Sequence, residues 1–127
     1  GNREGMWAAE GGYDFVAEVM FNGIDVDGYF LEYDSERAGT FEPLRFVPKG
    51  KVVALGLVSS KSPVLETVDA LQRRIEEGSR FATIERLSLA PQCGFASSIG
   101  GNPLSEDDEA PKLARIADVA REVWSDA

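Results

Sequence analysis

The sequence contains no histidine and only one cysteine, Cys93. Without histidine, the chain by itself cannot supply the Ser–His or Cys–His pairs that activate many nucleophiles, and it lacks the commonest transition-metal ligand. A lone cysteine excludes a disulfide within the chain, which is typical of proteins in a reducing compartment. We therefore expect a cytoplasmic protein whose chemistry does not depend on a histidine of this chain.

Long apolar runs and an excess of basic charge are also missing. No stretch approaches the roughly 20 apolar residues of a membrane span, and the N-terminus has no signal-like pattern. Lys and Arg number 13 against 22 Asp and Glu, which gives a net charge of −9. Because such a surface repels phosphates, we expect neither a nucleic acid nor a membrane as a partner.

The composition is that of a globular domain with a modest core: 127 residues, 43% hydrophobic and 28% charged. Hydrophobic spacing predicts helices and strands in alternation. Helices are predicted at 13–21, 62–78 and 105–123, strands at 26–34, 51–60 and 86–90, and a loop with a helical turn between the first two strands. The near-continuous apolar run at 51–60 favours a parallel sheet, and the alternation predicts right-handed βαβ units.

The predicted helix boundaries depend on local signals. Ser62 and Pro63 mark the start of the second helix, and Ser105 with the acidic residues after it caps the third. Pro111 is awkward inside that third helix, so its regular part could begin only there. A parallel sheet of three strands is thin, and three helices barely cover it. The sequence therefore predicts an α/β chain that forms a single partial domain over residues 1–127.

Polar side chains follow each predicted strand, at the edge where parallel α/β folds bind ligands. They are Glu32 and Asp34, then Ser59, Ser60 and Lys61, and finally Gln92 and Cys93. A thiolate and a carboxylate at one edge suit zinc, which accepts sulfur, nitrogen and oxygen ligands. Zinc requires at least three protein ligands. Either there is no metal, or the remaining ligands lie outside this chain.

Simpler interpretations exist for each candidate. Glu32 could pair with Arg37 or Arg45 as a structural ion pair. Lys61 could be a solvated loop lysine, and Cys93 could be a buried, inert thiol, because free cysteine is among the most buried residue types. From the residues alone, these alternatives remain open.

Two long stretches resemble a known family. "YFLEYDSERAGTFEPLRFVPKGKVVALGLVSSKSPVLE" and "RLSLAPQCGFASSIGGNPLSEDDEAPKL" are similar to the C-terminal part of the cobalamin-independent methionine synthase family, with "LEYD…RAG", "GLVSSKSP…LE" and "QCGFAS" in the family's order. The resemblance covers essentially the whole chain. It implies a TIM (β/α)8 barrel with a catalytic zinc at its carboxyl-end face, of which this chain would be about the last three strands.

The resemblance also implies a ligand set. Glu32 and Cys93 match two zinc ligands of the family, while the other two, a His-x-Cys pair, are expected immediately upstream of Gly1. In the relatives closest in pattern that pair is followed by "GN", with which this chain begins. No cobalamin is expected. The implied substrates are a small-molecule thiol such as homocysteine and a folate-like methyl donor, which Asp34, Ser59 and the candidate catalytic residue Lys61 would help to orient.

One position departs from the family pattern. True methionine synthases carry an acid–base histidine where this chain has Lys61, and lysine is a poor proton shuttle near neutral pH. Three functions therefore remain: a zinc-dependent thiol methyltransferase of methionine biosynthesis, resembling 5-methyltetrahydropteroyltriglutamate–homocysteine methyltransferase; a related zinc enzyme with another alkyl donor, such as an epoxide; or a non-catalytic structural fragment. Alone, the chain would expose two sheet edges, so we expect it to need the missing barrel strands or self-association.

Overall fold

A parallel sheet forms the centre of the molecule in this computed structural model, which describes residues 2–3, 6–7, 10–96 and 99–125. The sheet has the order β3 (Gly28–Glu32), β4 (Val52–Val58) and β5 (Leu87–Pro91). A short antiparallel pair, β1 (Asn2–Arg3) and β2 (Met6–Trp7), lies outside the predicted elements. Among the described residues, no helix is both long and apolar enough to cross a membrane.

The apolar run predicted as a strand forms the middle of the sheet. β4 is paired in parallel with β3 on one side and β5 on the other, and it is buried from Val53 to Val58. Each of the three predicted strands is found, with β3 and β4 shorter at both ends than expected. The parallel βα order confirms the expected α/β class.

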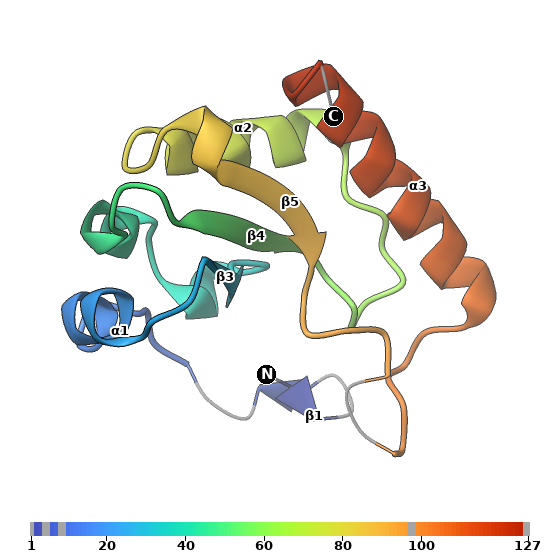
Figure 1. Cartoon of the computed structure of the whole chain (residues 1–127). Helices are drawn as coiled ribbons and strands as arrows, with labels where there is room; N and C mark the ends of the chain where they lie inside the picture. The colour runs from blue at the N-terminus through green and yellow to red at the C-terminus, as the bar shows by residue number, and fades with distance from the viewer. Residues whose placement is uncertain (1, 4–5, 8–9, 97–98, 126–127) are drawn as a thin grey trace.

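One face of the sheet carries the core. Tyr29 and Leu31 of β3 align with Val53 and Leu55 of β4, and all four are buried. On this side α2 (Val68–Ser79) and α3 (Glu106–Val123) pack against the sheet (Figure 1). The helix α1 (Ala17–Gly23) packs with the 3₁₀ helix η2 (Glu42–Phe46) beside β3. The apolar stripes of these helices thus close one side of the sheet.

The opposite face is exposed at Phe30 of β3 but buried along most of β4. Its residues alternate with those of the core, so that Phe30 aligns with Ala54, and Glu32 aligns with Gly56 and then Ala90. Phe30 is 86% exposed, although it lies in a strand beside the buried β4. The next row, from Glu32 to Ala90, places a carboxylate beside two small residues.

The first two helices begin later than predicted. α1 starts at Ala17 rather than near Tyr13, because the Tyr13 ring packs against Tyr33 at 5.5 Å between centroids and its hydroxyl accepts a hydrogen bond from the Glu32 N–H at 3.0 Å. α2 starts at Val68 rather than at Ser62. Its actual N-cap is Thr67, whose side chain accepts a hydrogen bond from the backbone of the first turn, and residues 62–67 have no regular structure.

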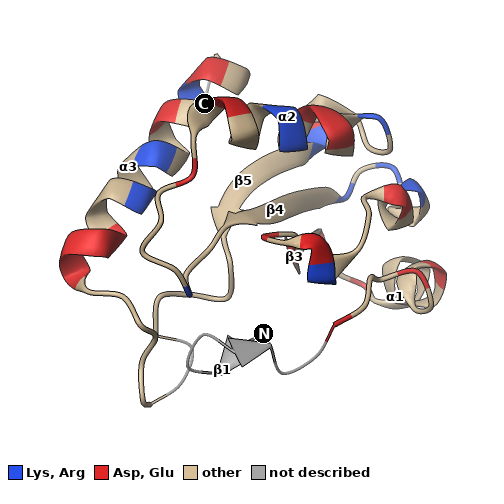
Figure 2. Ribbon diagram, turned by 180° about the vertical axis from the view of Figure 1, so that it is seen from behind, with Lys and Arg blue, Asp and Glu red and all other residues tan. Residues whose placement is uncertain are grey.

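The third helix begins at its capping signal. Ser105 accepts a hydrogen bond from the Asp108 N–H, and the Asp108 carboxylate accepts one from the Ser105 N–H. This reciprocal cap fixes the first turn, so Pro111 lies inside α3 and the alternative start at Pro111 is wrong. Acidic residues gather on this first turn, whereas β4 and β5 carry only uncharged residues (Figure 2).

Candidate functional site

A cavity of about 330 Å³ lies on the face of the sheet that carries Phe30, toward the carboxyl ends of the strands. Ala54, Gly56 and Ala90 contribute small side chains to its lining, which leaves room between the strands. Glu32 at the end of β3 and Cys93 just after β5 both line it. The full lining consists of Phe30, Leu31, Glu32, Ala54, Gly56, Ala90, Pro91, Gln92 and Cys93.

Glu32 is held by an arginine, as the simpler interpretation proposed. Arg37 Nη2 donates to Glu32 Oε2 at 2.9 Å and to Asp34 Oδ1 at 3.3 Å, and its side chain is almost fully buried. Partial burial acts to raise the pKa of Glu32, but hydrogen bonds from Arg37 and Cys93 outweigh it and bring the pKa down to about 2. Glu32 is therefore an ionised carboxylate at neutral pH. Arg45 does not reach it and lies against Phe46 instead.

Asp34 has a different environment from its neighbour. Burial raises its pKa, and the charge of Arg37 only partly opposes that effect. Asp34 contacts Arg37 but is not part of the cavity lining. Asp34 thus contacts Arg37, the arginine that orients Glu32. The contact of Asp34 with substrate stays a prediction.

Cys93 and Lys61 lie next to each other. Cys93 is exposed and is followed by Gly94, whose φ of +108° only glycine adopts without strain. Lys61 Nζ lies 3.5 Å from Cys93 Sγ and 3.0 Å from Ser60 Oγ. The Lys61 residue is only 6% exposed, so it is not the solvated lysine of the simpler interpretation. Cys93 is likewise not a buried, inert thiol.

Ser59 and Gln92 connect the ends of β4 and β5. Ser59 Oγ donates to Gln92 Oε1 at 3.0 Å, and the Ser60 N–H donates to the same oxygen at 3.1 Å. Gln92 is 5% exposed and directly precedes Cys93. Ser59 therefore acts on the turn that carries Cys93, and it is not itself part of the cavity lining.

Sequence reasoning missed three residues that support this site. The Tyr13 hydroxyl binds the Glu32 backbone, and the side chains of Glu66 and Lys112 hold the segment that follows β4. The hydrophobic spacing places Tyr13 in the first predicted helix and Lys112 in the third, with no role for either. Nothing in their local sequence distinguishes them, because each acts on a residue far away along the chain.

Glu32 and Cys93 are the residues that could hold a metal. Both residues line the same cavity, and a carboxylate together with a sulfur is a donor pair that suits zinc. Over residues 10–96 and 99–125, no group of three or more His, Cys, Asp or Glu side chains comes together that could hold a metal. Glu32 and Cys93 could therefore hold a metal only together with further donors from outside the described residues.

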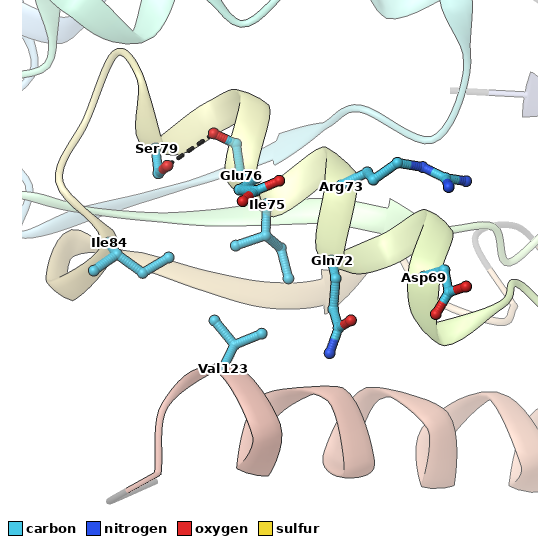
Figure 3. Close-up of a pocket in the computed structure, with 8 residues that line it drawn as sticks. All are labelled: Asp69, Gln72, Arg73, Ile75, Glu76, Ser79, Ile84 and Val123. Atoms are coloured by element: carbon cyan, nitrogen blue, oxygen red, sulfur yellow. Dashed lines mark hydrogen bonds between the residues drawn. The ribbon is translucent and has the colours of Figure 1, made fainter.

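A larger hollow of about 580 Å³ lies elsewhere, between α2 and α3 (Figure 3). Apolar side chains of Ile75, Ile84 and Val123 face one another across it, and the charged side chains of α2 lie at its rim. Ser79 donates to the Glu76 carbonyl at 2.8 Å within the helix. Its lining has no thiol and no buried charged group, so we place the functional site in the smaller cavity of Glu32 and Cys93.

Comparison with known proteins identifies the class to which this fold and cavity belong. Residues 14–121 match the catalytic domain of cobalamin-independent synthase, and the chain belongs to this family. Two curated proteins of Bacillus subtilis (strain 168), the uncharacterized proteins YxjG and YxjH, are 50% and 48% identical to it over 125 residues. Each match covers 98% of this chain and 33% of the relative. The chain thus spans about a third of the length of these relatives.

Solved structures agree with this assignment. A putative vitamin-B12 independent methionine synthase from Listeria monocytogenes matches with a TM-score of 0.69 and 32% identity, covering 86% of this chain and 31% of that one. A B12-independent methionine synthase from Shewanella sp. W3-18-1, solved with selenomethionine, shares the fold with a TM-score of 0.73 and 21% identity, covering 90% of this chain and 31% of that one. The expected family and the expected class, parallel βα units of a (β/α)8 barrel, are both confirmed.

Proposed function

We propose that this chain is the C-terminal part of the active-site barrel of a zinc-dependent enzyme that transfers a methyl group to a small-molecule thiol. The observation that carries the proposal is the meeting of Glu32 and Cys93 in one cavity, at the carboxyl ends of β3 and β5. Residues 1–127 would then be a single partial domain, and the upstream polypeptide would supply the His-x-Cys pair. Membership of the cobalamin-independent family supports a reaction without cobalamin.

Each residue of the chain has a defined task in this proposal. Bound zinc would supply a positive charge that keeps a substrate sulfur in its reactive thiolate form. Glu32 and Cys93 would hold the metal, and Arg37 would fix one oxygen of Glu32 through the 2.9 Å contact. Asp34 would in turn hold Arg37. The row of small residues beside Glu32 would leave space for a homocysteine-like thiol and a folate-like methyl donor.

A related function is favoured by the position of Lys61. Its amine lies 3.5 Å from Cys93 Sγ, where methionine synthases are expected to carry a histidine. Lysine presents a fixed positive charge, which would stabilise the alkoxide formed when a thiolate opens an epoxide. Assays of thiol alkylation with a methyl-folate donor and with epoxides, each against homocysteine and other thiols, would separate the two reactions. Under either proposal, we infer that the protein is cytoplasmic.

Zinc stoichiometry tests the proposal directly. The full-length protein, with its upstream polypeptide, should bind about one zinc ion per chain, and Glu32→Gln and Cys93→Ser should each weaken zinc binding at least about 100-fold, since each removes a direct ligand. Glu36→Gln is the matched control, because Glu36 is exposed and does not line the cavity. Undiminished zinc binding by the Glu32→Gln, Cys93→Ser double variant would refute the assignment. Tight binding of one zinc ion by residues 1–127 alone would refute the inference that a pair of ligands comes from outside this chain.

A further inference from the structure

Three successive backbone N–H groups after β4 are held by side chains. The Ser59 N–H donates to Glu66 Oε1 at 2.8 Å, the Ser60 N–H to Gln92 Oε1 at 3.1 Å, and the Lys61 N–H to Ser59 Oγ at 3.2 Å. Such side-chain acceptors replace the ladder of the sheet and define the path of the turn. The turn places Lys61 Nζ beside Cys93 Sγ.

The acceptor at the start of this turn is itself held by α3. Lys112 Nζ donates to Glu66 Oε2 at 2.9 Å and to the Val64 carbonyl at 2.6 Å, while Arg115 donates to the Glu66 carbonyl at 2.7 Å. Lys112 is completely buried. Burying a lysine is unfavourable unless it is paired, so this position is not explained by packing alone. The ion pair joins α3 to the segment between β4 and α2.

We propose that Glu66 and Lys112 are positioning residues for the active site. Through Glu66, Lys112 fixes the turn at 59–61, and the turn sets the Lys61 amine against Cys93. This inference rests on the proposed function, since it assigns the pair a task in that reaction. A displacement of about 1 Å at a catalytic centre can reduce a rate on the order of 100-fold. Loss of the ion pair would free the Ser59 N–H and allow such a displacement.

A purely structural pair and a positioning pair predict different results. A buried ion pair replaced on both sides by apolar residues often keeps its stability, whereas removal of one partner leaves an unpaired buried charge. We would compare Lys112→Met, Lys112→Arg and the Glu66→Met, Lys112→Met double variant in the full-length protein. Arg121→Met is the matched control, because it removes one positive charge and one exposed ion pair from the same helix.

Three measurements apply to each variant: the melting temperature, the amide hydrogen exchange of residues 59–61, and kcat and KM for methyl transfer to homocysteine. Lys112→Met should lower the melting temperature and accelerate exchange at Ser59 by about 10-fold or more. The double variant should regain the melting temperature but keep the fast exchange and a kcat reduced about 10- to 100-fold, with KM little changed. Lys112→Arg should keep much of the melting temperature and of kcat, and Arg121→Met should change neither quantity.

Wild-type kcat in the double variant would overturn the proposal, as would unchanged exchange at Ser59. If the unsubstituted protein transfers no methyl group, the proposed function fails, but the positioning role is still decided by a crystal structure of the double variant. A Lys61 Nζ to Cys93 Sγ separation that stays at 3.5 Å would overturn it, and a widened separation with a displaced 59–61 turn would support it.

Discussion

Gly56 offers the sharpest test of how the sheet shapes the cavity. It lies in the middle strand, between Glu32 and Ala90, and it lines the cavity. A Cβ at this position would meet the Leu31 carbonyl oxygen at 2.9 Å, the Pro91 carbonyl oxygen at 3.3 Å and the Glu32 Cα at 3.5 Å. All three are backbone atoms of the neighbouring strands, which cannot rotate away as a side chain would. Gly56→Ala must therefore separate the strands.

Two opposing effects determine how much Gly56→Ala changes the free energy of unfolding. Overpacking a core costs about 1–3 kcal/mol, while replacing glycine by alanine in a strand recovers about 0.5–1 kcal/mol of chain entropy. We expect Gly56→Ala to reduce the free energy of unfolding by about 1–2 kcal/mol. Because the strain falls on the backbone of Leu31 and Glu32, zinc affinity of the full-length protein should fall on the order of 10-fold.

The assay is urea unfolding of the purified protein, paired with zinc titration. Gly23→Ala is the matched control: the same change at the end of α1, where an added Cβ meets nothing within 4 Å, should be neutral or stabilise by about 0.5–1 kcal/mol. The reasoning is refuted if Gly56→Ala is as stable as the unsubstituted protein, or if it destabilises no more than Gly23→Ala.

Two further predictions concern the ends of the fold. Ser105→Ala should cost about 1 kcal/mol by loss of the N-cap, measured by thermal unfolding. Hydrogen bonds from Ser105 lower the pKa of Asp108. Their contribution to stability is therefore fully present above the usual Asp pKa of about 3.9 and is lost as the pH falls through the lowered pKa. The difference in stability between Ser105→Ala and the unsubstituted protein should thus narrow in acid, and a constant difference would contradict this. Phe15→Ser with Val19→Ser, at the exposed apolar side of α1, should reduce self-association of the isolated chain in sedimentation, and an unchanged association state would exclude this surface as its cause.

The sequence was sufficient for the sheet and for the edge at which the site lies. β4 was predictable because a strand buried on both faces leaves an unbroken apolar run, and its parallel pairing follows from the alternation with helices. The convergence of Glu32 and Cys93 followed from the rule that parallel strands end at one edge. The arginine that pairs with Glu32 could not be predicted in the same way, because the sequence offered two, and the fold brings only Arg37 to it.

The predicted start of α2 was wrong because two local signals competed, Ser62 with Pro63 and the actual N-cap Thr67, and local sequence did not rank them. Ser62 and Pro63 are good start signals, but the residues after them have no regular structure and contact α3, 46 residues further along the chain. The same contacts are made by Lys112, which is completely buried. Long-range polar contacts thus accompany the absence of a helix over residues 62–67.

The incorrectly predicted start of α2 lies beside the candidate functional site. Local signals and the fold agree over most of the chain, and they disagree in the segment that leads from Ser59 to α2. A segment kept out of a helix that its own sequence favours must be stabilised elsewhere, and here the stabilising groups are Glu66 and Lys112. Disagreements of this kind concentrate at functional sites, because function there constrains the backbone more than local preference does. The irregular segment at 62–67 is therefore consistent with the proposed positioning of the Lys61 amine beside Cys93.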